Sequence, residues 1–204
     1  MANSTIGNIR ERILSQGPGT MFVPSDFAYL NNDDAVSRAL SRLFEEGLLI
    51  RLYNGLYLYP KRNRIGIEHP FLQDIANAIA RRDRVEIIPT GASAANALGL
   101  SEQVPSRAVY ITTGSPRVVN IGNRSITFKR QSPKYLAYKN RIALLLVLAL
   151  KDIGEREITP EQRLRIKEIA NDFAEDKDFN EDLLLAPAWI RKYIKEIRNE
   201  QLVS

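Results

Sequence analysis

The chain has 204 residues, 44% of them hydrophobic, which is enough for one large domain or two small ones with real cores. Lysine and arginine outnumber aspartate and glutamate by 29 to 24, and the net charge of +5 suits a polyanionic partner without identifying it. The absence of cysteine excludes disulfides and thiolate sites and is typical of a reducing cytoplasm. Residues 1–13 show no secretion signal, and the longest apolar run, Ile142–Leu150, is shorter than the roughly 20 residues that cross a bilayer. We expect a cytoplasmic protein without membrane contact, with a buried helix at Ile142–Leu150.

The charge is distributed unevenly along the chain. Residues 1–69 carry a net charge of +1, residues 70–141 carry +7, and residues 142–204 carry −3. The stretch 61–69 is polar, contains the permissive Gly66, and precedes Pro70, which can open a helix. These features predict a boundary there, with one domain at 1–65 and a second at 70–204.

The first helix is expected at about residues 4–16, because apolar residues recur there at three- and four-residue spacing and Gly17 with Pro18 then stops it. Its predicted inward stripe consists of Ile6, Ile9, Ile13 and Leu14. A brief second helix is expected to begin at Ser25, a good N-cap residue, and to end at Asn31 and Asn32. Phe27 and Leu30 are expected to face inward.

A third helix follows, with Asp33 and Asp34 placed where acidic groups favour a helix N-terminus. The spacing predicts a buried side of Val36, Ala39, Leu40, Leu43 and Phe44. The opposite, exposed face then presents Ser37, Arg38, Ser41, Arg42 and Glu45. Gly47 closes the helix, and two β-rich runs at 48–52 and 56–59 surround Asn54 and Gly55, a strong hairpin signal.

This order of elements predicts a winged helix-turn-helix that binds double-stranded DNA. Arginine can donate two parallel hydrogen bonds to a guanine edge or hold a phosphate, and serine hydroxyls allow close approach. The predicted reading residues are Ser37, Arg38, Ser41 and Arg42. Phosphate or minor-groove contacts are predicted for Arg51, Tyr53, Asn54, Lys61, Arg62 and Arg64. Each set has an alternative: an arginine-rich face can be ordinary solvated surface, and a winged helix can serve protein contacts alone. Tyr57 and Tyr59 are expected to pack within the hairpin.

From Pro70 on, the pattern predicts an α+β domain with a small, mostly antiparallel sheet followed by helices. The helices are expected at 71–79, at 92–98, and from about Tyr138, Pro160 and Pro187. The strands are expected at 85–88, 108–113, 118–121 and 125–129. The first helix should bury Phe71, Ile75, Ala78 and Ile79. A basic surface could be extended by Arg117, Arg124, Lys129, Arg130 and Lys134, although an ordinary solvated sheet face is an equal alternative.

Little in the sequence favours an enzyme. The turn Pro89–Gly91 could present N–H groups to a phosphate, but it lacks the lysine and further glycines of nucleotide-binding loops, and its alanines more simply allow close helix–sheet packing. His69 is the only histidine, and Asp74, Asp83 and Glu86 form no recognisable acid-base motif. We expect no catalytic residue, no metal and no cofactor.

The sequence also resembles a known family, the AbiEi-type antitoxins and transcriptional regulators of type IV toxin-antitoxin systems. The similarity covers about residues 20–150. Its first part consists of Phe22–Phe27, Ala35–Leu43, Gly47 with Leu48, and Gly55–Tyr57. Its second part consists of Pro89–Leu100, Gln103–Pro105 and Val109–Thr112.

The resemblance implies a bacterial abortive-infection system in which the winged helix binds operator DNA and represses its own operon. It also implies that the C-terminal domain counteracts a nucleotidyltransferase-type toxin, often in that family without a stable complex. The last 50 residues match no motif. The competing interpretations are a protein-interaction module that docks a toxin or other acidic partner without sequence-specific DNA binding, and an RNA-binding protein.

Overall fold

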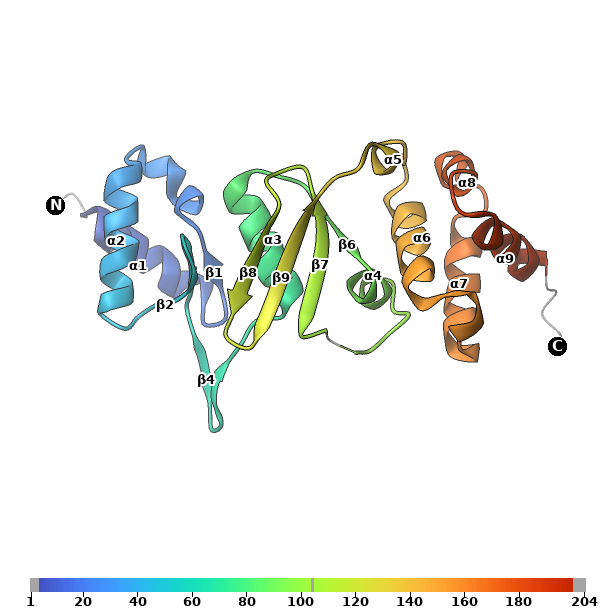
Figure 1. Ribbon diagram of the computed structural model, residues 1–204. Coiled ribbons are helices and arrows are strands. Elements are labelled where there is room, and N and C mark those ends of the chain that lie inside the picture. Colours follow the sequence, from blue (N-terminus) through green and yellow to red (C-terminus); the bar gives the residue numbers. More distant parts are fainter. Residues whose placement is uncertain (1–3, 104, 200–204) are drawn as a thin grey trace. The chain divides into compact units, whose positions relative to one another are not determined.

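The computed structural model describes residues 4–103 and 105–199 (Figure 1). Val104, part of the second resemblance motif, lies outside these residues. The chain divides into two compact units: unit 1 holds the residues up to 86 together with 119–125, and unit 2 holds 87–118 and the residues from 126 on. As predicted, the fold is α+β, with small antiparallel sheets and a helical C-terminal part.

Unit 1 begins with helices that alternate with short strands. In chain order its elements are α1 (Thr5–Gln16), β1 (Met21–Phe22), the 3₁₀ segment η1 (Pro24–Leu30), α2 (Asp33–Glu45), β2 (Ile50–Tyr53), β3 (Leu56–Leu58), β4 (Lys61–Asn63), β5 (Gly66–Glu68) and α3 (Leu72–Asp83). One core joins α1, η1, α2 and β3, and it contains Ile9, Ile13, Phe22, Phe27, Val36, Ala39, Leu40, Leu43, Leu49 and Tyr57.

Helix α1 starts where Ser4 Oγ accepts a hydrogen bond from Gly7 N at 3.3 Å. Ile9 and Ile13 are fully buried, as predicted. The prediction for Leu14 was wrong, because this side chain is 48% exposed. It follows Ile13 directly, and a turn of about 100° per residue carries it away from the buried stripe.

The second helical segment differs from its prediction. It is a 3₁₀ helix with an irregular residue at Phe27 (φ −116°), and it starts at Pro24 with Val23, and not Ser25, as its N-cap. Among the described residues, no side chain caps the first turn as Ser25 was expected to do; instead the Asp26 carboxylate, at the third helical position, accepts a hydrogen bond from Val23 N at 2.8 Å. Phe27 is buried as predicted, and Leu30 is half-buried against the core.

Helix α2 begins where Asn32 Oδ1 accepts a hydrogen bond from Ala35 N at 3.0 Å. The inward residues were predicted correctly with one exception. Phe44 is 41% exposed, because it sits at the edge of the stripe in the last turn of the helix. A three-stranded sheet of order β1-β3-β2 follows, in which Tyr57 packs into the core as expected.

The stretch 61–69, predicted as a boundary, is folded. β4 and β5 pair antiparallel as a separate two-stranded sheet, with Lys61 opposite Glu68 and Asn63 opposite Gly66. Helix α3 then packs against β1 and β3 of the same unit. Ile75 and Ile79 are buried as predicted, but Phe71 is 62% exposed, because it is the N-cap and precedes the amphipathic turns.

The second half of the chain contains the third sheet, of strand order β6-β7-β9-β8. Its strands are β6 (Ile87–Thr90), β7 (Arg107–Thr112), β8 (Arg117–Ile121) and β9 (Arg124–Arg130). All four were predicted, with β6 displaced by two residues towards the C-terminus. β6 and β7 pair antiparallel, with Ile87 opposite Thr112.

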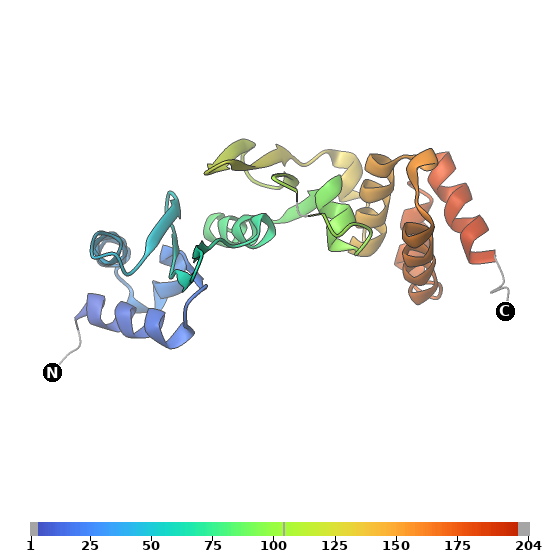
Figure 2. The ribbon, with the colours of Figure 1, turned by 90° about the horizontal axis from the view of Figure 1, so that it is seen from below.

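The helices of unit 2 surround a core built on one of them. They are α4 (Ala92–Ala97), α5 (Pro133–Leu136), α6 (Arg141–Ile153), η2 (Glu155–Glu157), α7 (Pro160–Asp172), α8 (Lys177–Leu183) and α9 (Ala188–Asn199). α5 and α8 were not predicted. Every residue from Ala143 to Leu150 is buried, which confirms the predicted buried helix. Figures 1 and 2 show the orange-to-red helices as a bundle, in which α6 contacts α8 and α7 contacts α9.

Within residues 4–103 and 105–199, no helix has both the length and the apolar character that crossing a membrane requires.

Candidate nucleic-acid interface

The outer face of α2 presents the predicted reading residues to solvent. Ser37, Arg38, Ser41 and Arg42 are all exposed, while the opposite face of the helix is packed into the core. The four positions follow an i, i+1, i+4, i+5 pattern, which places them on one side of an α-helix. The helix therefore carries two guanidinium groups and two hydroxyls on a single convex surface.

Both arginines of this face already have local partners. Arg38 Nε donates to the carbonyl oxygen of Asp34 at 3.3 Å, within the same helix. Arg42 Nε lies 3.1 Å from Glu46 Oε1, and Arg10 of α1 also binds the Glu46 carboxylate. These hydrogen bonds, first from Arg10 and then from Arg42, hold the pKa of Glu46 below its ordinary value. Arg42 thus faces solvent as one member of an ion pair.

The hairpin predicted as the wing is tied to the body of unit 1. Arg51 Nη2 donates to Asn54 Oδ1 at 3.1 Å, so two candidate contact residues bind each other. Arg82 of α3 donates to the Asn54 carbonyl oxygen and stacks over the Tyr53 ring at 5.4 Å from its centroid. The turn at Asn54 therefore leans on α3 and is not a free projection.

A second hairpin, which we call the arm, is free where the first is not. The arm consists of β4, the turn at Arg64 and Ile65, and β5. Figure 1 shows it extending away from the helices of unit 1. Residues 61–66 are all exposed, and they include the predicted contact residues Lys61, Arg62 and Arg64. Lys61 Nζ pairs with Glu68 Oε2 at 3.0 Å across the strands.

The five additional basic residues serve several local roles. Arg117 stacks on the Phe128 ring at 4.9 Å, and Arg124 donates to the carbonyl oxygen of Pro70 at 2.9 Å. Lys134 lies over the Tyr135 ring at 4.9 Å. Lys129 lines a pocket, and Arg130 is exposed. Arg117 and Arg124 are thus engaged by neighbouring groups in their own units.

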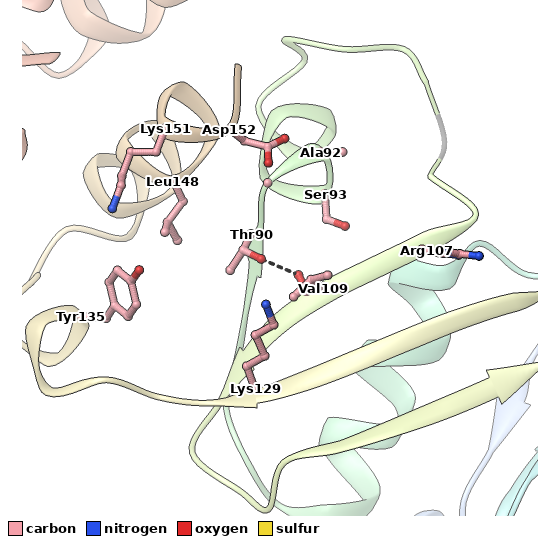
Figure 3. Close-up of a pocket in the computed structure, with 11 residues that line it drawn as sticks. Thr90, Ala92, Ser93, Arg107, Val109, Lys129, Tyr135, Leu148, Lys151 and Asp152 are labelled. Atoms are coloured by element: carbon pink, nitrogen blue, oxygen red, sulfur yellow. Dashed lines mark hydrogen bonds between the residues drawn. The ribbon is translucent and has the colours of Figure 1, made fainter. Parts of the chain in front are cut away.

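One pocket of unit 2 is lined by three cationic side chains, those of Arg107, Lys129 and Lys151 (Figure 3). Its volume is about 420 Å³. Figure 3 shows Lys129 rising from β9 towards Thr90, whose Oγ1 donates to the Val109 carbonyl oxygen at 3.1 Å. The lining residues are Thr90, Gly91, Ala92, Ser93, Arg107, Val109, Lys129, Tyr135, Leu148, Lys151 and Asp152.

The same pocket also contains the turn at Gly91, before α4, which the sequence offered as a possible phosphate site. Gly91 adopts φ +55°, and a Cβ placed on it would lie 2.8 Å from Asp152 Oδ1. A carboxylate therefore fills the space in front of this turn, where it would repel a phosphate. Ala94 and Ala95 are buried, and α4 packs against α6 and β6. Close helix packing, the simpler of the two sequence interpretations, accounts for the small residues.

The residues considered for catalysis lie on the surface or in a local ion pair. Asp83 pairs with Arg82 at 2.7 Å, while His69, Asp74 and Glu86 are exposed. Over the described part of the chain, no group of three or more histidine, cysteine, aspartate or glutamate side chains could hold a metal ion.

Sequence reasoning missed one residue of the arm. Ile65 is 98% exposed at the tip of the turn. The sequence does contain a hairpin signal here, because the turn-forming Asn63 and the glycine Gly66 enclose the two turn positions, 64 and 65. This signal was outweighed by the polarity of the stretch, which favoured a linker.

Comparison with known proteins adds a family and a distant structural likeness. None of the curated proteins is similar enough in sequence to be a relative. The crystal structure of the RV2827C protein from Mycobacterium tuberculosis is similar over 96% of this chain and 75% of that one, at 14% identity and a TM-score of 0.48. The model of the family of unknown function DUF6088 matches residues 8–177. That match spans most of the length, and the chain belongs to the DUF6088 family.

Proposed function

We propose that this protein is a transcriptional regulator that binds double-stranded operator DNA and represses its own operon. The observation that carries the proposal is the outer face of α2, where Ser37, Arg38, Ser41 and Arg42 are exposed together. A helix of about 10–12 Å diameter fits the major groove of B-DNA, which is about 12 Å wide. The face therefore has both the shape and the donors of a recognition helix.

The order of elements in unit 1 supports this role. A short helical segment, η1, precedes α2, and the β2–β3 hairpin follows it, which is the order of a winged helix-turn-helix. The hydrophobic side of α2 packs on α1 and η1, so the helix is held rigidly while its other side is exposed. Rigid presentation is what base readout requires.

The charge of the face suits DNA as well. Arg38 and Arg42 can each donate a pair of hydrogen bonds to a guanine edge or to a phosphate. Glu46 is paired with Arg10 as well as with Arg42, so its carboxylate keeps a cationic partner when Arg42 binds DNA.

The second half of the proposal is that the protein acts as the antitoxin of a type IV toxin-antitoxin system. It rests on the resemblance of residues 20–150 to AbiEi-type antitoxins. Unit 2 offers exposed apolar side chains that could contact a nucleotidyltransferase-type toxin: Leu136, Leu164, Leu184 and Leu185, all at least half exposed. Leu184 and Leu185 are consecutive, and neighbouring exposed apolar side chains favour a protein contact more than a single one does.

The regulatory claim is tested by titrating the protein against the duplex upstream of its gene and a scrambled duplex of equal length. We expect a clear preference for the upstream duplex, and affinity that falls as salt rises. Equal affinity for both duplexes, or none for either, would refute the claim.

Single substitutions on the outer face of α2 distinguish base contacts from phosphate contacts. Arg38→Ala or Arg42→Ala should cost about 1–3 kcal/mol of binding free energy and relax specificity if the side chain reads a base. A phosphate contact would instead lower the salt slope by about one unit. Arg156→Ala is the matched control, since Arg156 is an exposed arginine of unit 2.

The alternative function is a protein-docking module, which the exposed leucines of unit 2 favour. Its test uses the full chain and the product of the downstream reading frame. Capture of that product by the wild type, its loss in Leu184→Ser with Leu185→Ser, and no shift of any duplex would favour docking. If the protein prefers single-stranded RNA to duplex DNA in a competition assay, the result would favour an RNA-binding protein, the other interpretation of the sequence.

A further inference from the structure

We propose that the arm enters the minor groove of the bound duplex and that Ile65 wedges between two base pairs and bends the DNA. This inference rests on the proposed DNA binding and adds a second contact, with a distinct mechanism, to the one made by α2. It follows from the exposure of Ile65, the charges beside it, the stiffness of the turn and the reach of the hairpin.

Ile65 occupies the turn at the tip of the arm. Its side chain is 98% exposed, more than any other large hydrophobic residue among those described. A single exposed apolar residue is common on a protein surface. This one, however, occupies the end of a hairpin that projects from unit 1, where no core of the unit can cover it. At the leading end of a projection, an apolar side chain is placed to be the first group that meets an approaching partner.

The charges around Ile65 indicate what that partner is. Arg62 and Arg64 are exposed, and neither guanidinium has an ion-pair partner among the described residues. Lys61 adds a third cation at the base of the arm, although it is paired with Glu68 at 3.0 Å. An isoleucine flanked by unpaired arginines matches a polyanion with an apolar interior, which is the description of stacked base pairs between two phosphate backbones.

The turn holds Ile65 in place. Asn63 Oδ1 accepts hydrogen bonds from Ile65 N at 2.8 Å and from Gly66 N at 3.0 Å. Both amides at the tip are therefore bonded to one side chain, and Gly66 takes φ +137°, a conformation that suits glycine. A tip fixed in this way presents the isoleucine side chain at lower entropic cost than a loose loop would.

The arm is long enough for its tip to reach into the minor groove. Each strand of the arm has 3 residues, which at about 3.4 Å per residue extends roughly 10 Å. The minor groove is about 7.5 Å deep, so the tip can reach its floor. Arginine is the residue that a narrow minor groove attracts, and an inserted apolar side chain there unstacks one step and kinks the duplex. The arm brings both residue types to one turn.

The test measures DNA bending by the full-length protein, using circularly permuted fragments of the region upstream of its gene. The wild type should bend the fragment by about 20–90°, the range seen for inserted side chains. Ile65→Ala should still shift the fragment, with Kd raised by no more than roughly tenfold, but the bend should be lost. Ile65→Met, which keeps an apolar wedge, should retain the bend. Leu14→Ala, which removes an exposed leucine of α1, should change neither quantity.

The outcomes separate this inference from the function on which it rests. If the wild type shifts no duplex, both fall. If it binds the upstream duplex without bending it, or if Ile65→Ala bends DNA as the wild type does, only the wedge is refuted. Replacement of thymine by uracil removes methyl groups from the major groove alone. A loss of affinity on that replacement, absent in Ile65→Ala, would place the isoleucine in the major groove and overturn the inference.

Discussion

Arg82 of α3 donates a hydrogen bond through Nη1 to the main-chain carbonyl oxygen of Asn54, a residue 28 positions earlier in the chain. The same guanidinium stacks over the Tyr53 ring and pairs with Asp83 at 2.7 Å. One arginine thus fastens the β2–β3 hairpin to a helix. Arg62, in the arm, differs from Arg82: it is exposed and has no ion-pair partner among the described residues. We therefore expect Arg82 to contribute to stability and Arg62 to contribute to duplex binding.

This difference predicts opposite effects of two substitutions. Arg82→Ala should lower the free energy of unfolding by about 1–3 kcal/mol, the cost of losing a hydrogen bond from a charged donor and its ring contact. Its hydrogen exchange at residues 50–58 should be faster than in the wild type, while duplex binding is retained. Arg62→Ala should stay within about 0.5 kcal/mol in stability and weaken duplex binding. Chemical denaturation and gel shifts on the same samples decide between this pattern and its reverse.

The Glu46 carboxylate is expected to restrain Arg42. Glu46→Gln removes the charge that holds Arg42 at 3.1 Å and so frees the guanidinium for DNA. We expect Kd for the upstream duplex to fall by roughly two- to fivefold, since a surface ion pair is weak and screened by salt. Glu45→Gln is the matched control, because it removes the same charge from the same exposed helix end. An equal gain in both variants would mean that net charge alone is responsible.

The same carboxylate predicts a dependence of stability on pH. Hydrogen bonds from Arg10, and then from Arg42, hold the pKa of Glu46 below its ordinary value of 4.5. The folded state therefore favours the charged form, and the resulting stabilisation is present above pH 4.5 and is lost as the pH falls through the lower, folded value. Denaturation midpoints of the wild type should approach those of Glu46→Gln as the pH falls from 4.5 through that lower value. A constant difference down to strong acid would contradict this assignment.

Local sequence signals located most of the elements. The apolar run Ile142–Leu150 predicted its buried helix, and the residues of α2 separated into buried and exposed sides, because periodicity and capping act within a few residues. The errors at Leu14, Phe44 and Phe71 all lie where an apolar residue borders a stripe or begins a helix. At such places the sequence has the right composition but only the surrounding packing decides exposure.

Long-range contacts were out of reach of sequence reasoning. Arg82 and Asn54 approach each other only because α3 packs on β3, and nothing in either residue's neighbourhood indicates it. The same holds for Gly91 and Asp152, which meet in the pocket of unit 2. The arm was hidden for another reason: its two strands are exposed on both faces, so they lack the alternation of apolar and polar residues that marks a half-buried strand.

The approach of Asp152 to Gly91 predicts a costly substitution. Gly91→Ala combines the strain of φ +55° with a Cβ at 2.8 Å from Asp152 Oδ1. Gly154→Ala is the matched control, since Gly154 has φ +83° but nothing within 4 Å of its Cβ position. We expect the control to cost about 1–2 kcal/mol of unfolding free energy and Gly91→Ala about 1–3 kcal/mol more. Adding Asp152→Ala to Gly91→Ala should restore only the additional loss of unfolding free energy. If it restores none, the contact between the new Cβ and Asp152 does not cause that loss.

A buried carboxylate in α8 is expected to hold the start of α6. Asp182 is 2% exposed, and its Oδ2 accepts hydrogen bonds from Lys139 N at 2.7 Å and from Asn140 N at 2.6 Å. Each hydrogen bond to a charged group contributes about 1.5–3 kcal/mol, so Asp182→Ala should lower the free energy of unfolding by roughly 3 kcal/mol or more. Asp178→Ala, at an exposed position of the same helix, should change it by no more than about 0.5 kcal/mol.

The fluorescence of Trp189 is the appropriate measurement for Asp182, because it is the only tryptophan and packs against the core of unit 2. The denaturation midpoint read from this signal should fall in Asp182→Ala and hold in Asp178→Ala. Asp182→Asn should lie between them, because the amide oxygen can still accept a bond but carries no charge. Equal midpoints in all three variants would mean that the two amides find other partners and that Asp182 is not what joins α8 to the start of α6.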